Sequence, residues 1–328
     1  MLKFSRTRRA VILAALASTM MAAPISHSAA ADVTIPVIVK DTTSYYWQIV
    51  LAGARKAGKD LGVDVPELGA QSESDINGQI SILENAVTSG SKAIVIAPTE
   101  YTALGAPIDQ AAKSVPVIGL DSAPNSKALT SFLSTDNVQG GRNAADALAA
   151  AIGEANGGKV EGEVALIKAL SGSGSVDARV QGFEEQLKDK YPSLKLVYDK
   201  VADGQAATAL NMTTDLLTSN PNIKGIFASN LIMAQGAGQA VAENNVKDTV
   251  ALVGFDSDEK LVGFLKDGVI DALIVQDPFR MGYDGVKTAL AVVKGEKVEA
   301  KIDTGVNVIT SKNIADARSQ ELLNPKIN

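Results

Sequence analysis

Short apolar runs alternate with longer amphipathic segments along most of this sequence, from Val33 onward. The apolar runs are rich in β-branched residues and include TIPVIVK, KAIVIAP, VPVIGLD, EVALIKAL, KGIFASN, TVALVGFD and DALIVQD. The segments between them have helical periodicity and include residues 46–62, 137–155, 180–191 and 278–294. Uniformly apolar strands separated by helices are typical of parallel sheets covered by helices on both faces. The sequence therefore predicts an α/β fold built from doubly wound parallel sheets.

The first 31 residues have the pattern of a secretion signal. Basic residues precede the apolar run AVILAALASTMMAA, and the small residues of SAAAD offer a cleavage site after Ala31. The apolar run is short for a membrane span, which needs about 20 residues. We expect the segment to be removed and the mature chain to be released into a bacterial periplasm, where a large core can replace disulfides.

The mature chain offers few catalytic side chains. The only histidine, His27, lies in the expected signal, and cysteine is absent from the sequence. Serine–histidine, cysteine–histidine and histidine–zinc sites are therefore excluded from it, which favours a binding protein over an enzyme. Without the signal, 27 basic residues stand against 37 acidic ones, a formal net charge of −10. Such a charge disfavours nucleic acid and anionic lipid as partners.

Two strands end in the same pattern, VIGLD at Asp121 and LVGFD at Asp256. In open α/β sheets, ligands bind outside the carboxyl ends of the strands. Two such sheets that face one another would bring both aspartates into one crevice. The alternative is that each aspartate is a helix cap or a turn former.

Other polar and aromatic residues also lie next to strand ends. Tyr45 and Tyr46 follow the first strand, where flat rings can stack on the apolar face of a sugar; we expect Trp47 beside them to point into the core. The guanidinium of Arg179 suits vicinal hydroxyls or a carboxylate, although a surface salt bridge is the ordinary alternative. The amides of Asn230 and Gln276 suit neutral polar ligands, but caps and turns remain open for both.

Taken together, these pieces resemble the periplasmic sugar-binding proteins of the ribose-binding family, which are type I solute receptors of ABC importers. The resemblance covers essentially the whole mature chain. It is carried by the aromatic pair after the first strand and by GLD, STDNVQGG, ARVQGF, IFASN, VGFD and the Q-x-P of IVQDP.

The resemblance implies a ligand-binding set. Its members are Thr43, Tyr45, Tyr46, Asp121, Ser122, Arg179, Asn230, Asp256 and Gln276. Three positions depart from the ribose type: Ser122 stands in place of arginine, Gly204 in place of a third aromatic residue, and Leu231 in place of an acidic one. These departures argue against D-ribose and predict a roomier, less charged site for a larger monosaccharide, a polyol or a sugar with an apolar substituent.

The resemblance also implies two lobes joined by three hinge crossings, near the short turns at residues 135–137, 276–278 and 303–306. We expect a signal peptide at 1–31, an N-terminal lobe of 32–135 plus 277–305, and a C-terminal lobe of 136–276 plus 306–328. The expected partners are a sugar or polyol and the membrane permease of an ABC importer. We expect a monomer with no cofactor, metal ion, catalytic residue or bound nucleic acid.

Two other functions remain open at this point. A sensory receptor that passes its ligand to a chemoreceptor or a sensor kinase would share the fold. A glycoside-processing enzyme could use Asp121 and Asp256 as paired carboxylates. The enzymatic function is disfavoured, because a shell of arginine and amides would keep both aspartates ionised and neither could act as the general acid.

Overall fold

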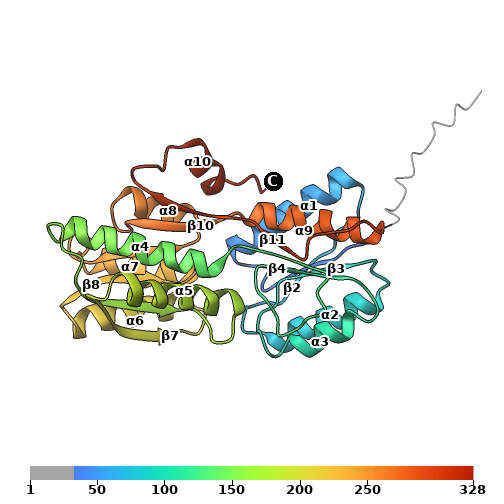
Figure 1. The fold of residues 1–328 in the computed structure, drawn as a ribbon, viewed down its shortest axis with the longest axis horizontal. Helices are drawn as coiled ribbons and strands as arrows, with labels where there is room; N and C mark the ends of the chain where they lie inside the picture. Colours follow the sequence, from blue (N-terminus) through green and yellow to red (C-terminus); the bar gives the residue numbers. More distant parts are fainter. Residues whose placement is uncertain (1–32, 328) are drawn as a thin grey trace, which may run out of the picture. The chain divides into compact units, whose positions relative to one another are not determined.

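A computed structural model describes residues 33–327, so the predicted signal peptide lies outside the described residues. The first of its two sheets has the strand order β11-β5-β4-β3-β1-β2, and all neighbouring strands are parallel. The bounds are β1 Val37–Val39, β2 Glu67–Gly69, β3 Ile94–Ile96, β4 Val117–Leu120, β5 Ser131–Ser134 and β11 Lys301–Asp303. Helices α1 (Tyr45–Leu61) and α9 (Pro278–Val293) cover one face, and α2 (Ile76–Thr88) and α3 (Gly105–Ala111) cover the other (Figure 1).

The second sheet has the corresponding order β12-β10-β9-β8-β6-β7. Its strands are parallel except for β12, which runs antiparallel to β10. The bounds are β6 Gly162–Lys168, β7 Leu194–Val201, β8 Ile223–Ala228, β9 Ala251–Phe255, β10 Ala272–Gln276 and β12 Val306–Thr310. Its helices are α4 Asn137–Ala155, α5 Gly174–Lys190, α6 Ala206–Ser219, α7 Leu231–Glu243 and α8 Glu259–Lys266, and α10 (Ala317–Leu323) follows β12. The predicted fold class is confirmed.

The chain passes between the two sheets where turn residues interrupt the apolar pattern. β5 ends at Ser134 in the first sheet, and the next strand, β6, belongs to the second. β10 ends at Gln276 in the second sheet, and α9 returns to the first. β11 and β12 are neighbours in sequence but belong to different sheets. The exact lobe boundaries stay a prediction, which we take up below.

Paired glycines let helices cross closely on one face of each sheet. A Cβ atom at Gly282 of α9 would lie 1.9 Å from the Val50 carbonyl oxygen of α1. A Cβ atom at Gly182 of α5 would lie 1.9 Å from the Val138 carbonyl oxygen of α4. No side chain fits at these crossings, so glycine is required for the two backbones to touch. The second crossing fixes the part of α5 that carries the predicted ligand-binding residue Arg179.

Asp136 is the N-cap of α4. Its side chain accepts a hydrogen bond from the Gln139 amide at 3.0 Å. Asn137 is instead the first helical residue and is buried. Its side chain is therefore free to interact with α5.

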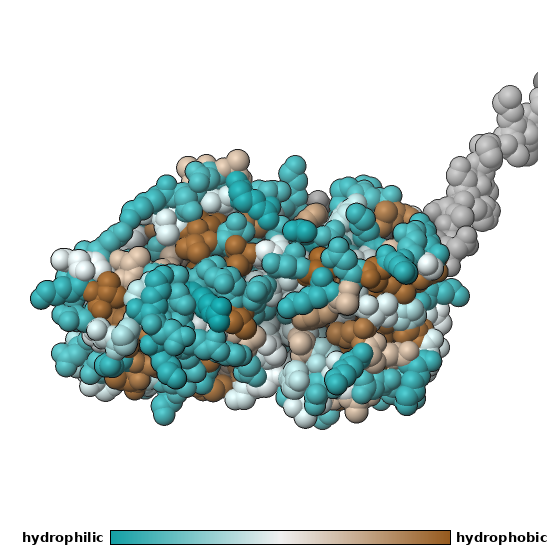
Figure 2. Space-filling model, in the orientation of Figure 1, coloured by the Kyte–Doolittle hydropathy of each residue, from teal (hydrophilic) through white to brown (hydrophobic). Residues whose placement is uncertain are grey.

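The surface is predominantly polar. Figure 2 shows hydrophilic residues over most of one face, with small hydrophobic areas interrupted by polar ones. Among the described residues, the exposed large hydrophobic side chains are Tyr101, Val197 and Val201. Within residues 33–327, no helix is both long enough and apolar enough to cross a bilayer.

Candidate functional site

The two predicted aspartates occupy equivalent places in the two sheets. Asp121 follows β4 and Asp256 follows β9, the third strand in the order of each sheet. Both have left-handed backbone conformations, with φ of 58° and 69°, which aspartate tolerates better than most residues. Both are more than nine-tenths buried. These turns at the carboxyl ends of the strands direct both carboxylates toward one site.

That site consists of two adjoining cavities. The inner cavity, of about 30 Å³, is lined by residues from the ends of both sheets: Lys40, Ser44, Tyr46, Trp47, Glu73, Asp121, Ser175, Val176, Arg179, Asn230, Leu231, Ile232, Asp256 and Gln276. The outer cavity, of about 540 Å³, is lined in part by Thr43, Tyr45, Glu73, Gly204 and Asn230. Every predicted site residue except Ser122 lines one of the two cavities.

Asp121 is held as a carboxylate by three neighbours. The Lys40 amine lies 3.2 Å from its Oδ2, and the Ser122 hydroxyl donates to Oδ2 at 2.8 Å. The Tyr46 hydroxyl donates to Oδ1 at 2.9 Å. Burial acts to raise the pKa of Asp121, but the Lys40 amine, the Ser122 hydroxyl and the charge of Arg179 lower it. Ser122 therefore stabilises the Asp121 carboxylate without lining either cavity itself.

Lys40 was not predicted to belong to the site. It follows β1 directly and is 2 % exposed. Its amine lies 3.1 Å from the Ser173 hydroxyl and 3.4 Å from the Ser175 hydroxyl, at the start of α5. Lys40 thus joins the first sheet to a helix of the second. Lys40 places a cation beside Asp121, where Ser122 stands in place of the arginine of the ribose type; the expectation of a less charged site stays a prediction.

Asp256 has a different environment. The Gln276 amide donates to its Oδ1 at 2.8 Å, and the Leu231 amide donates to Oδ2 at 3.3 Å. Burial raises the pKa of Asp256, although Arg179 and Gln276 oppose the effect. The expectation that a shell of arginine and amides keeps both aspartates ionised is supported at Asp121 by its lowered pKa, whereas the raised pKa of Asp256 does not support it. Gln276 is 2 % exposed, and its Oε1 has no hydrogen-bond partner among residues 33–327.

Arg179 lies between the two aspartates and is 2 % exposed, so it is not a surface salt bridge. Its guanidinium stacks over Phe255 with the Cζ atom 3.3 Å from the ring centroid. It donates to the Asn137 side-chain oxygen at 2.8 and 3.3 Å and to the Ser229 carbonyl. Burial lowers the pKa of Arg179, and the charges of Asp256 and Asp121 act against that effect.

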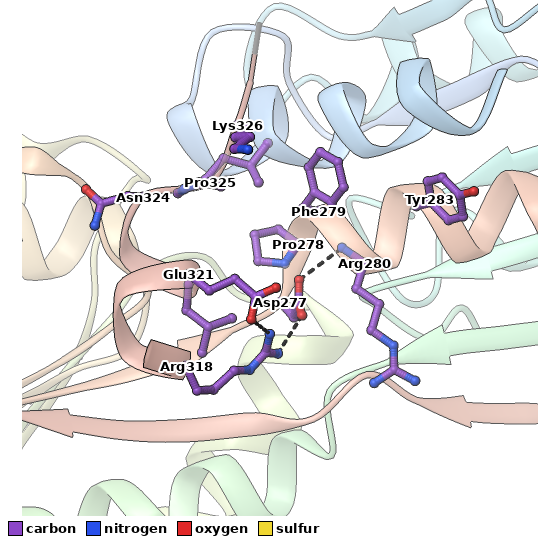
Figure 3. Close-up of a pocket in the computed structure, with 12 residues that line it drawn as sticks. Asp277, Pro278, Phe279, Arg280, Tyr283, Arg318, Glu321, Asn324, Pro325 and Lys326 are labelled. Carbon is purple, nitrogen blue, oxygen red and sulfur yellow. Dashed lines mark hydrogen bonds and ion pairs between the residues drawn. The ribbon is translucent and has the colours of Figure 1, made fainter. Parts of the chain in front are cut away.

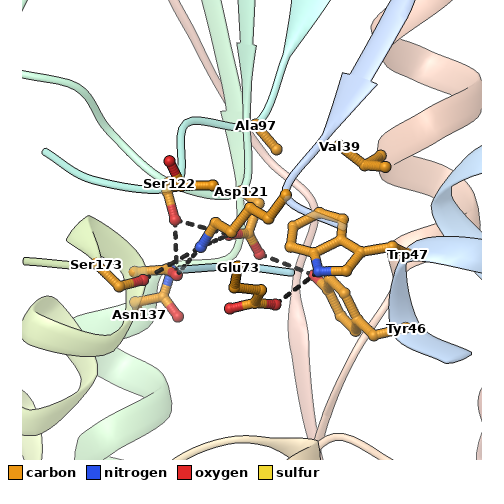
Figure 4. A network of polar contacts seen from close by, with 12 residues as sticks. Val39, Tyr46, Trp47, Glu73, Ala97, Asp121, Ser122, Asn137 and Ser173 are labelled. Atoms are coloured by element: carbon orange, nitrogen blue, oxygen red, sulfur yellow. Dashed lines mark hydrogen bonds and ion pairs between the residues drawn. The ribbon is translucent and has the colours of Figure 1, made fainter. Parts of the chain in front are cut away.

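The aromatic residues divide differently from the expectation. Tyr46 lines the inner cavity and Tyr45 the outer one. Trp47 is buried as predicted, but it also lines the inner cavity, and its Nε1 donates to Glu73 Oε1 at 2.7 Å (Figure 4). The Tyr46 and Trp47 rings meet edge to face, with centroids 4.8 Å apart. The aromatic cluster therefore builds a wall of the site and positions an acidic residue.

Two predicted residues also have local structural roles, which the sequence had left open for Asn230 but not for Thr43. The Thr43 amide and hydroxyl donate to Asp41 Oδ1 at 2.6 and 2.9 Å, in the turn before α1. Asn230 caps α7, where its Oδ1 accepts from the Met233 amide at 3.0 Å. The Asn230 side-chain NH2 group makes no hydrogen bond to residues 33–327, which leaves it available at the cavities.

A larger cavity, of about 850 Å³, lies elsewhere, between α1, α9 and the carboxyl-terminal segment (Figure 3). One of its charged groups, Arg318, is paired twice: it lies 2.6 Å from Asp277 and 2.7 Å from Glu321. None of the predicted site residues lines it. Within residues 33–327, no group of three or more His, Cys, Asp or Glu residues could hold a metal ion.

Comparison with known proteins agrees with this geometry. Residues 35–297 match the family model described as periplasmic binding protein domain. The ribose import binding protein of Haemophilus influenzae is 31% identical over 91% of this chain and 99% of its own. The D-allose-binding periplasmic protein of Escherichia coli is also 31% identical, over 85% of this chain and 91% of its own.

Two solved structures are similar as well. A carbohydrate transporter solute-binding protein of Agrobacterium radiobacter, in complex with D-arabinose, is 66% identical, with a TM-score of 0.89 over 90% of this chain and 99% of its own. An ABC transporter solute-binding protein of Agrobacterium vitis, with bound D-fucose, is 37% identical, with a TM-score of 0.84 over 89% of this chain and 100% of its own. The resemblance read from the sequence is confirmed: this chain belongs to the periplasmic binding protein family, among relatives of the ribose-binding type.

Proposed function

We propose that this protein captures a neutral monosaccharide in the cleft between two lobes and delivers it to the permease of an ABC importer. The observation that carries the proposal is the meeting of equivalent strand ends at one cavity. Asp121 and Asp256 come from the two sheets, and the buried Gln276 Oε1, which lines the same cavity, has no donor among residues 33–327. Carboxylates accept the strongest hydrogen bonds from hydroxyl groups, and sugars offer several of these in a small volume.

The sugars bound by two similar proteins indicate which monosaccharides to expect as ligands of this one. D-arabinose and D-fucose are bound by the two similar solved structures described above, and both are neutral sugars that can adopt pyranose rings. We propose an aldopentose or deoxyhexose as the ligand, with D-arabinose as the first candidate rather than D-ribose. The aromatic rings of Tyr45 and Tyr46 would contact the apolar face of the ring.

We propose the lobes 32–135 plus 277–305 and 136–276 plus 306–328, because the chain passes between the sheets next to these boundaries. The closed arrangement would be stabilised by ligand contacts from both lobes. We further propose that the protein acts in the periplasm as a monomer after removal of residues 1–31. It would catalyse no reaction, and incubation with chromogenic glycosides should give no turnover.

A thermal-shift screen over pentoses, hexoses, deoxysugars and polyols tests the proposal. D-arabinose should raise the melting temperature of the wild type. Asp256→Ala should abolish this shift, because it removes a buried acceptor from the cavity. Asp248→Ala, at an exposed position, is the control and should retain the shift. A flat response of the wild type across the whole panel would refute sugar binding.

A further inference from the structure

Glu73 is a charged residue of the cleft that no strand-end pattern predicts. It lies in the loop between β2 and α2 and lines both the inner and the outer cavity. Its Oε1 accepts the hydrogen bond from Trp47 Nε1 at 2.7 Å (Figure 4). Its other oxygen, Oε2, accepts no hydrogen bond from residues 33–327, and Glu73 makes no ion pair with a described lysine or arginine. One carboxylate oxygen is therefore fixed and the other is available.

The inner cavity that Glu73 lines has more negatively charged than positively charged side chains. The inner cavity is lined by three carboxylates, Glu73, Asp121 and Asp256, and by two cations, Lys40 and Arg179. Asp121 and Asp256 already accept hydrogen bonds on both oxygens. Burial raises the pKa of Glu73, with Lys40 and Trp47 acting against the effect.

A second acceptor in the same cavity is unpartnered. Gln276 Oε1 is buried and has no donor among the described residues. A buried acceptor without a donor is costly, so Gln276 Oε1 indicates where a ligand donates. Glu73 is half-buried and lines the same cavity, where its Oε2 offers a further acceptor. Glu73 Oε2 and Gln276 Oε1 lie on opposite sheets of the molecule, since Glu73 follows β2 and Gln276 ends β10.

We propose that Glu73 is a further ligand-binding residue, that its Oε2 accepts a hydrogen bond from one sugar hydroxyl, and that Trp47 positions it. This inference rests on the proposed function and deepens it, because it makes the cleft selective for sugars that carry a hydroxyl at one particular ring position. The Trp47 indole donates from a rigid ring, so it fixes the direction of the carboxylate without adding charge.

The test measures binding by calorimetry, with D-arabinose and its monodeoxy analogues as probes. Glu73→Gln keeps the shape and the Trp47 contact but replaces a charged acceptor with a neutral one, so the affinity for D-arabinose should fall about tenfold. The analogue that lacks the contacted hydroxyl should bind wild type and Glu73→Gln equally well. Glu161→Gln, at an exposed position, is the control and should change neither affinity nor melting temperature.

A separate measurement tests whether Trp47 positions Glu73. Trp47→Phe removes the Nε1 donor and keeps a ring, so it should narrow the difference in affinity between D-arabinose and the analogue that lacks the contacted hydroxyl, whereas a loss of wall packing alone would lower both affinities by the same factor. If Glu73→Gln binds every probe as wild type does, or loses the same factor for every analogue, Glu73 contacts no hydroxyl and the inference is wrong. If the wild type itself binds no sugar, the proposed function fails first.

Discussion

Replacing Lys40 with methionine should destabilise the protein strongly at neutral pH and much less in acid. The Lys40 amine lies 3.2 Å from Asp121 Oδ2, and both side chains are at least 96 % buried. At this distance, an effective dielectric constant of about 20 gives an attraction of roughly 5 kcal/mol. Part of this attraction is offset in the comparison, because the charge of Lys40 loses its hydration on burial and methionine carries no such charge. We expect a loss of about 3 to 5 kcal/mol in the free energy of unfolding, as for other broken buried pairs.

The pH dependence follows from the pKa of Asp121. In the wild type this pKa is lowered, so the stability from the pair is present above the pKa of the unfolded chain, about 3.9, and is lost in acid. In Lys40→Met the buried carboxyl loses its nearest cation, and its pKa should rise above that value. The variant then becomes relatively more stable as Asp121 is protonated. The difference in the free energy of unfolding between the variant and the wild type should therefore decrease as the pH falls toward about 4.

Urea unfolding at both pH values, followed by far-UV circular dichroism, measures the effect. The double variant Lys40→Met/Asp121→Asn removes both charges, and asparagine tolerates the left-handed backbone at position 121. It should regain most of the lost stability at neutral pH. An equal loss at both pH values, with no recovery in the double variant, would refute the assignment of Lys40 as the counter-ion of Asp121.

Other predictions concern packing and buried polar contacts. Gly182→Ala and Gly282→Ala should each destabilise the protein by about 1 to 3 kcal/mol, because each added methyl group meets a backbone oxygen at 1.9 Å. Only Gly182→Ala should also weaken sugar binding in calorimetry, since it shifts the helix that carries Arg179. Gln79→Leu should lower the free energy of unfolding by about 3 kcal/mol, because the fully buried Gln79 amide contacts the Val39 and Ala97 carbonyls and its oxygen accepts from Thr99. Equal binding by the two glycine variants, or an unchanged urea midpoint for Gln79→Leu, would contradict these expectations.

The apolar alternation predicted the sheets well where a strand is buried on both faces. TVALVGFD contains β9 and DALIVQD contains β10, both buried along their whole length, and residues 137–155 coincide with α4. Strands β2 (Glu67–Gly69) and β5 (Ser131–Ser134) were not predicted, because each is short and lacks an uninterrupted apolar run. Their strand conformation comes from pairing with β1 and β4, which a local pattern does not contain.

The strand-end rule predicted the aspartates of the site but not all of its charges. Asp121 and Asp256 repeat one short pattern, so their equivalence is visible in the sequence. Glu73 lies in a loop without periodicity, and only the tertiary structure brings it to Trp47. Lys40 follows the strand-end rule equally well, and a cation directly after an apolar strand was the signal that could have revealed it.

The exchange between Ser122 and Lys40 shows why a departure from a family pattern has to be judged in space. Position 122 lacks the arginine of the ribose type, and this absence, together with Leu231 in place of an acidic residue, suggested a less charged cleft. β1 lies two strands from β4 in the sheet, so its carboxyl end is close enough for Lys40 to reach Asp121. The cation beside Asp121 is thus a compact ammonium instead of the planar guanidinium, with its fork of donors, that an arginine at position 122 would offer. Selectivity should therefore depend on the orientation of the sugar hydroxyl groups that such a donor can reach.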